Sequence, residues 1–254
     1  MKITEHIDAL RHEGTLLAEA AARTDLSAPV PTCPEWQLGD LLRHVGHVHR
    51  WATAIPSRRL SAPLDEAGVE AAVGPMPSDA ALVDWFREGH ATLVDALVKA
   101  PADVECWTFM PAPSPLAFWA RRQAHETAIH RHDADAAAGV PGPAVGTALA
   151  LDGIDELVRG FMTRSRATLH SDRPRTLQVR ATDGHGTWRL TITQEPPAVT
   201  TDESSEPADL TLTGPARELY LLLWNRLPAE QARQVEPTGD RDLLDLWRNA
   251  AAIG

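Results

Sequence analysis

The sequence has little of what disulfide-rich, membrane-spanning or nucleic-acid-binding proteins need. Its two cysteines, Cys33 and Cys106, are too few for a disulfide framework. No apolar run approaches the roughly 18 residues of a membrane span, and the charged N-terminal segment does not resemble a signal peptide. Lys and Arg total 24 against 35 Asp and Glu, which leaves no excess of positive charge for nucleic acid or anionic lipid. We expect a cytoplasmic protein that binds neither.

The first half of the chain has the pattern of helices. The whole chain has 254 residues, 43% of them hydrophobic, which is enough for one large domain or two modest ones. Apolar spacing predicts four helices, over residues 3–24, 35–55, 78–99 and 116–138. Pro56 is expected to end the second helix, and the proline-containing stretches 57–77 and 101–115 are expected to be loops. Four helices with two long connections predict a four-helix bundle over residues 1–143.

The second half changes character. Residues 176–182 and 187–193 alternate apolar and polar side chains, and the turn sequence Asp-Gly-His-Gly between them predicts a hairpin. A third strand is expected at 209–213, and the acidic stretch 195–208 is expected to be a solvated loop. The predicted helices are 145–170, 215–226 and 241–250. The predicted class is therefore α+β, with a bundle followed by a smaller α+β domain over residues 144–254.

The fourth predicted helix places a carboxylate and an imidazole on one stripe. Glu126 and His130 are one turn apart, so an oxygen and a nitrogen could bind the same cation. A surface ion pair or a buried hydrogen bond would explain the same spacing. His125 lies five residues before His130 and points about 140° away from it. The two histidines therefore do not form the H-E-x-x-H motif of metalloproteases.

A third ligand would have to come from another helix. The second helix offers three histidines, His44, His47 and His49. His44 and His49 flank its apolar centre, whereas His47 points further away. Periodicity does not choose between His44 and His49, and a histidine-rich helix can also be simply packed or exposed.

Two stretches of the sequence are characteristic in combination. Pro31-Thr-Cys-Pro-Glu-Trp36 precedes the helix that carries His44, and Trp119–Ala134 contains the pattern R-x-x-x-E-x-x-x-H-x-x-D-A. Together they resemble the mycothiol-dependent maleylpyruvate isomerase family, whose N-terminal domain is a DinB-like four-helix bundle. Thr213–Arg226, with Trp-Asn-Arg where that family usually has Trp-Gly-Arg, and the later Gly239-Asp240 resemble its C-terminal domain. The resemblance thus covers nearly the whole chain.

The resemblance implies a specific set of metal ligands. By residue-for-residue correspondence they are His44, Glu126 and His130, which would hold Zn²⁺ or another divalent ion and leave one coordination position open. Arg122 and Asp133 then become candidates for orienting Glu126 and His130. An ordinary surface pairing of Arg122 with Asp133 is the alternative.

The resemblance also implies a reaction. Mycothiol, a low-molecular-weight thiol, would add as its thiolate to a conjugated cis double bond, and rotation and elimination would give the trans isomer. Thiol transfer to another small electrophilic substrate is the related outcome. Arg226 is the candidate catalytic residue that holds substrate carboxylates or an enolate, unless it only binds carbonyls at a helix end. The chain is expected to be a monomer or a homodimer.

Two other classes of function stay open at this point. A zinc hydrolase would need a general base, for which His47, His49 or Asp133 could serve. A non-catalytic bundle that binds a metal or a small ligand would need no base and no open position. Cys33 lies between prolines at the start of a helix, and we interpret it as a packing residue rather than a nucleophile.

Overall fold

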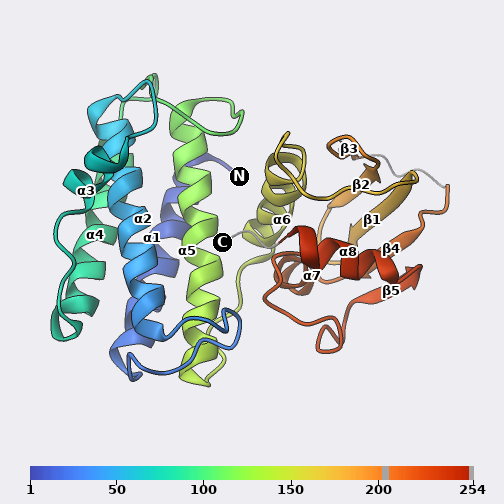
Figure 1. Ribbon diagram of the computed structural model, residues 1–254, viewed down its shortest axis with the longest axis horizontal. Helices are drawn as coiled ribbons and strands as arrows, with labels where there is room; N and C mark the ends of the chain where they lie inside the picture. The colour runs from blue at the N-terminus through green and yellow to red at the C-terminus, as the bar shows by residue number, and fades with distance from the viewer. Residues whose placement is uncertain (202–205, 252–254) are drawn as a thin grey trace. The chain divides into compact units, whose positions relative to one another are not determined.

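The computed structural model describes residues 1–201 and 206–251. The chain divides into two compact units, Met1–Pro143 and Ala144–Gly254 (Figure 1). None of the described helices combines the length and the apolar character needed to cross a membrane.

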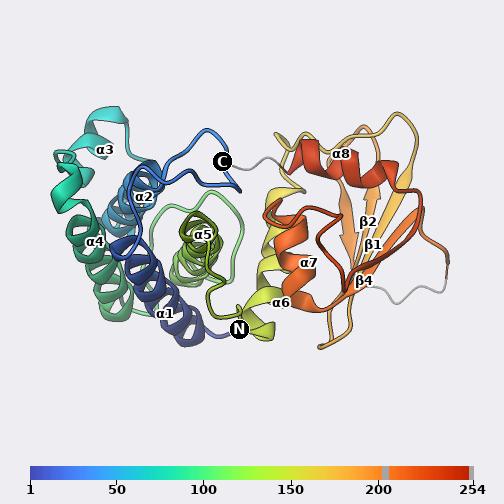
Figure 2. The same ribbon diagram turned by 90° about the horizontal axis from the view of Figure 1, so that it is seen from below.

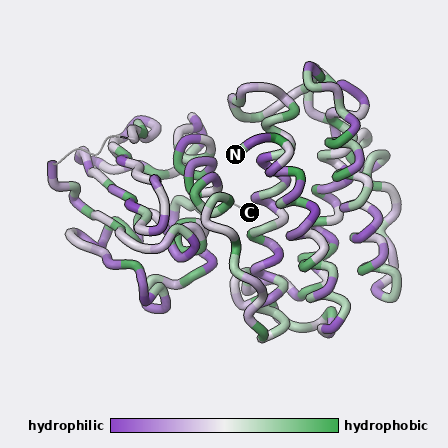
Figure 3. Tube along the Cα trace, turned by 180° about the vertical axis from the view of Figure 1, so that it is seen from behind, coloured by the Kyte–Doolittle hydropathy of each residue, from purple (hydrophilic) through white to green (hydrophobic). Residues whose placement is uncertain are grey.

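The first unit is a bundle of four long helices. These are α1 (Ile3–Ala22), α2 (Leu38–Arg58), α4 (Asp79–Lys99) and α5 (Pro115–Ala138). Helix α1 packs on α4 and α5, and α2 packs on the same two helices, which closes the bundle. Figure 3 shows hydrophilic and hydrophobic residues interspersed along these helices, as helices with one buried face require. The predicted four-helix arrangement is confirmed, with helix ends shifted by a few residues.

Two local predictions in this unit are wrong. The stretch 57–77, expected to be a loop, contains the short helix α3 (Glu66–Val73). The Asp65 side chain caps it by accepting a hydrogen bond from the Gly68 amide, and Gly74 ends it with φ at 72°. Pro56 lies inside α2 rather than ending it. Proline has no amide hydrogen to donate to the preceding turn, and α2 continues for only two residues after it, to Arg58.

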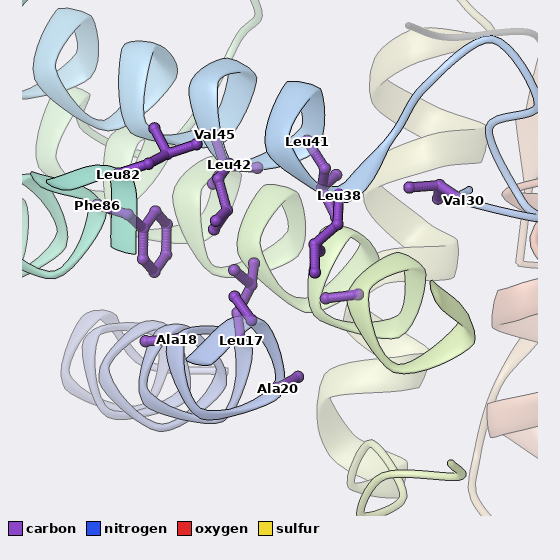
Figure 4. Close-up of a cluster of buried hydrophobic side chains, with 12 residues drawn as sticks. Leu17, Ala18, Ala20, Val30, Leu38, Leu41, Leu42, Val45, Leu82 and Phe86 are labelled. Atoms are coloured by element: carbon purple, nitrogen blue, oxygen red, sulfur yellow. The ribbon is translucent and has the colours of Figure 1, made fainter. Parts of the chain in front are cut away.

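A cluster of buried apolar side chains fixes how α2 faces the other helices. Leu38, Leu41, Leu42 and Val45 of α2 are fully buried in it, against side chains of α1 and α4 (Figure 4). Because these residues form the inward stripe of α2, the neighbouring His44 lies at the edge of the buried face. Its side chain is 29% exposed, which leaves it within reach of solvent and of α5.

The second unit is a mixed sheet with helices. It begins with α6 (Thr147–Asp155), which continues as a π-helix over Glu156–Phe161. The strands and later helices are β1 (Arg175–Ala181), β2 (Thr187–Ile192), β3 (Ala198–Thr200), β4 (Leu210–Gly214), α7 (Ala216–Leu223), β5 (Glu236–Gly239) and α8 (Asp242–Ala250).

The sheet confirms the α+β class. Its strand order is β3-β2-β1-β4-β5, with β1 and β4 parallel and the other neighbours antiparallel. Helix α6 packs on α7, and α7 contacts β1 and β4. Figure 2 shows α6 and α7 beside one face of the sheet and α8 across one end of the strands.

Three predictions in the second unit need correction. The helix predicted over 145–170 ends at Phe161, after the π-helical turn. The stretch 195–208 contains β3, although its residues 202–205 lie outside the described chain. Strand β5 was not predicted at all. Both missed strands are at sheet edges and have three and four residues, too few to show a period of two, and β5 contains a proline.

Candidate metal centre

Helices α2 and α5 bring three potential metal ligands together. His44 comes from α2, and Glu126 and His130 come from successive turns of α5. Glu126 Oε1 lies 3.2 Å from His44 Nε2 and 3.4 Å from His130 Nε2. One donor atom from each residue lies within 4.8 Å of the other two.

The spacing of these donor atoms suits a divalent metal ion. Zn²⁺ binds imidazole nitrogen and carboxylate oxygen at 2.0–2.2 Å, so two neighbouring donors of a tetrahedral site are about 3.3 Å apart. The two distances from Glu126 Oε1, 3.2 and 3.4 Å, are close to that value. Two imidazoles and one carboxylate are also a donor set that catalytic zinc sites use. The residues present therefore fit such an ion.

Arg122 orients the carboxylate of Glu126. It lies one turn earlier on α5, its side chain is 4% exposed, and its guanidinium is 3.3 Å from Glu126 Oε2. Oε1 is left to face the two histidines. Burial raises the pKa of Glu126, but hydrogen bonds with His130 and His44 and the charges of His130 and Arg122 lower it by more. The pKa therefore lies well below its usual range, and the group is a carboxylate, as a metal ligand must be.

Asp133 orients the imidazole of His130. Its buried Oδ2 lies 2.8 Å from His130 Nδ1, so Nδ1 donates to Asp133 and Nε2 is directed toward Glu126. Burial lowers the pKa of His130, but hydrogen bonds to Asp133 and Glu126 and their negative charges raise it to about 9. A carboxylate behind a histidine is the usual arrangement at metal centres. The surface pairing of Arg122 with Asp133 that the sequence left open is wrong, because both side chains are buried and each contacts a different predicted ligand.

The loop before α2, which contains Thr32, Cys33 and Trp36, covers one side of the three predicted ligands. Thr32 Oγ1 donates a hydrogen bond of 2.6 Å to Asp133 Oδ1, and Cys33 Sγ lies 3.7 Å from Asp133 Oδ2. The Trp36 ring packs on the rings of His44 and His130, with centroids 4.8 and 5.9 Å away. Cys33 also packs against the apolar cluster of the bundle, consistent with its interpretation as a packing residue. The contacts of Thr32 and Trp36 with these residues have no periodic signal in the sequence and were not predicted.

The structure separates His44 from the other histidines of α2. His49 is fully buried and its Nε2 lies 2.9 Å from Thr127 Oγ1, so it does not join the cluster. Burial holds the pKa of His49 well below its usual value. His47 is partly exposed. The choice of His44 over His49, which periodicity left open, therefore follows from packing. His125 is also buried away from the cluster, with its ring 6.0 Å from that of His6.

Arg226 lies just after α7 in the second unit. Its guanidinium donates to the Trp224 carbonyl at 3.1 Å, the helix-end contact that the sequence left open as an alternative. The preceding Asn225 has φ at 59°, a left-handed conformation that glycine adopts most easily and asparagine next. Asn225 therefore preserves the backbone turn at the position where the resembling sequences usually have glycine. What Arg226 does in catalysis stays a prediction.

Comparisons with known proteins bear on the family and the fold of the chain. Residues 7–135 match the family model described as "Mycothiol maleylpyruvate isomerase N-terminal domain", and residues 148–246 match "MDMPI C-terminal domain". No curated protein sequence is significantly similar to the chain. The crystal structure of the mycothiol-dependent maleylpyruvate isomerase has a TM-score of 0.62 and 11% identity, covering 94% of this chain and 93% of that one. A histidine-to-alanine mutant of that enzyme has a TM-score of 0.64 with the same identity and coverage. At this identity the likeness shows the fold.

Proposed function

The chain belongs to the mycothiol maleylpyruvate isomerase family, and we propose that it is a metal-dependent enzyme that uses mycothiol to isomerise or conjugate a small electrophile. The observation that supports this most strongly is the donor set of His44, Glu126 and His130, with donor spacings that suit one divalent ion. Arg122 contacts the carboxylate of Glu126, and Asp133 contacts the imidazole of His130. These contacts fix the orientation of both side chains. Such support is typical of a centre whose geometry must be kept.

The chemistry follows from what a metal and a thiol do together. A bound divalent ion such as Zn²⁺ would favour the thiolate of mycothiol over the thiol. For isomerisation, addition of the thiolate to one carbon of a conjugated cis double bond would move the electron pair of that bond to the conjugated carbonyl oxygen, as an enolate, and leave a single bond that can rotate. Return of the electron pair would then expel the thiolate and form the trans double bond. Thiol transfer would result if the carbon–sulfur bond were kept and the enolate took up a proton, or if a leaving group such as halide departed from the electrophile.

Within this proposal the residues of the chain have separate tasks. His44, Glu126 and His130 hold the ion, and Arg122 and Asp133 orient two of them. Negative charge develops on the electrophile when sulfur adds, and a cation is needed to stabilise it. Arg226 is proposed for that task, with the substrate carboxylate or enolate oxygen as its target.

A hydrolytic function is less well supported. Asp133 is fully buried and bound to His130 and Thr32, and His49 is fully buried against Thr127. Neither side chain is placed to take a proton from a solvent-derived nucleophile. His47 is partly exposed, and its interaction with His44 is a repulsion between the two imidazolium charges, not a hydrogen bond.

The experiment that tests the proposal uses the full chain loaded with Zn²⁺. It is incubated with mycothiol and maleylpyruvate, and separately with mycothiol and an aryl halide. Formation of the trans isomer without loss of thiol supports an isomerase, and accumulation of a thioether supports a transferase. If metal-loaded protein accelerates neither reaction over metal-free protein, the enzymatic proposal is wrong, and a non-catalytic metal-binding bundle becomes the better account.

A further inference from the structure

A line of hydrogen bonds connects the loop before α2 to the candidate metal centre. Thr32 Oγ1 donates to Asp133 Oδ1 at 2.6 Å, and Asp133 Oδ2 lies 2.8 Å from His130 Nδ1. On the other side of the same ring, His130 Nε2 lies 3.4 Å from Glu126 Oε1. Thr32, which is 101 positions away from Asp133 in the sequence, is thus connected to the proposed ligand His130 by two successive hydrogen bonds.

The loop holds the Thr32 hydroxyl in a defined position. The Val30 amide donates to the Trp36 carbonyl at 2.9 Å, and the Trp36 amide donates to the Cys33 carbonyl at 2.8 Å. A β-bridge between Pro29 and Gln37 closes the base of the loop. Prolines on both sides of the Thr32-Cys33 pair restrict the backbone further. The hydroxyl therefore approaches Asp133 from a constrained segment rather than from a flexible one.

Asp133 needs such a contact if it is to orient His130. The torsion that turns a carboxylate about its Cβ–Cγ bond is broad, so burial alone does not fix which way the two oxygens point. A short hydrogen bond to Oδ1 fixes the plane of the group and holds Oδ2 toward His130 Nδ1. The Trp36 ring, stacked on the face of His130 at an interplanar angle of 27°, limits the other motion of the imidazole.

We propose that Thr32 is a positioning residue of the metal centre, which fixes the carboxylate of Asp133 and through it the direction of His130 Nε2. The inference rests on the proposed metal site and adds to it a residue outside the two ligand-bearing helices. It predicts that the hydroxyl of Thr32 contributes to metal affinity although it contacts no ligand directly.

The test measures the affinity of the metal-free protein for Zn²⁺ in competition with a chromophoric chelator. Thr32→Val keeps the shape of the side chain and removes the hydroxyl, and it is expected to weaken binding roughly 5- to 20-fold, the low end of the effect of a residue behind a ligand. Thr32→Ser restores the hydroxyl and is expected to bind within about 2-fold of the wild type. Thr24→Val is the matched control. Thr24 is also partly buried, and its hydroxyl donates a hydrogen bond of 2.8 Å to the Ala20 carbonyl, which is not part of the metal centre. It should leave the affinity unchanged.

A double-mutant cycle decides whether Thr32 acts through Asp133. Asp133→Ala alone is expected to weaken Zn²⁺ binding 10- to 100-fold, as other residues behind metal ligands do. Adding Thr32→Val to Asp133→Ala should then cause little further loss, because the hydroxyl has no acceptor left to fix at that position. A purely structural role would lower the thermal stability of metal-free Thr32→Val without changing the affinity of the folded protein for Zn²⁺.

The outcomes separate this inference from the function on which it rests. If the wild type binds Zn²⁺ and Thr32→Val binds it equally well, or if the two substitutions are additive, the role of Thr32 is overturned and the metal site stands. If the wild type binds no Zn²⁺, both fail. Thermal unfolding of each metal-free variant shows that it is folded, and the Val and Ser pair at position 32 decides the matter if Asp133→Ala does not fold.

Discussion

A buried ion cluster joins α1 to the helix that carries two of the three proposed ligands. The Arg131 side chain of α5 is 3% exposed and binds Glu13 of α1 at 2.7 Å and Asp135 at 2.6 Å. Burial lowers the pKa of Arg131, but the two carboxylates raise it by more, so the charge pairing outweighs the loss of hydration. Replacing Arg131 would leave two nearly buried carboxylates without their cation.

Arg131→Met should therefore destabilise the bundle strongly. Removing one partner from a buried ion pair typically lowers the free energy of unfolding by about 3–5 kcal/mol. Glu13→Gln should lower it by about 1–2 kcal/mol, because the amide oxygen still accepts from Arg131 and a hydrogen bond from a charged donor to a neutral acceptor replaces the ion pair. Arg11→Met is the matched control on α1, where the pair with Asp8 is 50% and 72% exposed. Its effect should not exceed about 0.5 kcal/mol.

Urea unfolding of the metal-free protein, followed by circular dichroism at a helix-sensitive wavelength, measures these differences. The expected order of stability is wild type and Arg11→Met, then Glu13→Gln, then Arg131→Met. Equal urea midpoints for Arg131→Met and Arg11→Met would refute the reasoning. They would mean that a buried ion cluster contributes no more to the free energy of unfolding than an exposed ion pair does.

Three further predictions concern metal, pH and catalysis. Zn²⁺ at about 1,000 times its dissociation constant should raise the unfolding free energy of the bundle by about 4 kcal/mol. A calorimetric scan should show the corresponding rise in Tm for the wild type and none for His44→Ala. Burial lowers the pKa of His49 strongly and that of His90 less, so below pH 6.5 the unfolded chain binds more protons at these positions than the folded chain does. Stability should therefore fall as the pH drops from 6.5 toward the lowered pKa values, with a slope of at most about 1.4 kcal/mol per pH unit for each histidine, and a double substitution to Gln should flatten the fall of the urea midpoint. Arg226→Met should lower kcat/KM by roughly 100-fold with the metal content unchanged, whereas unchanged turnover would remove Arg226 from the mechanism.

Much of the bundle was predictable because its helices are long and amphipathic. Spacing placed Glu126 and His130 on one face of α5, and the structure brings both beside His44. Spacing could not separate His44 from His49, because both flank the same apolar stripe on α2. Only the packing of α2 against α5 separates them, since it directs His49 to Thr127 and His44 to Glu126.

The missed features depend on contacts between distant parts of the chain. The hydrogen bond from Thr32 to Asp133 spans 101 positions and leaves no periodic signal. Strands β3 and β5 are short edge strands that form only because a neighbour offers hydrogen bonds. The cap of α3, by contrast, was visible in the sequence as Asp65 followed by a helical stretch up to Gly74, and it could have been predicted.

The measurement that tests the central claim most directly is the metal content of the purified protein and its variants. Elemental analysis of the wild type after equilibration with Zn²⁺ and removal of excess ion should give about one ion per chain. His44→Ala, Glu126→Ala and His130→Ala should each lose it, while His49→Ala should retain it. A full complement of zinc in the three ligand variants, or none in the wild type, would contradict a metal centre built by α2 and α5.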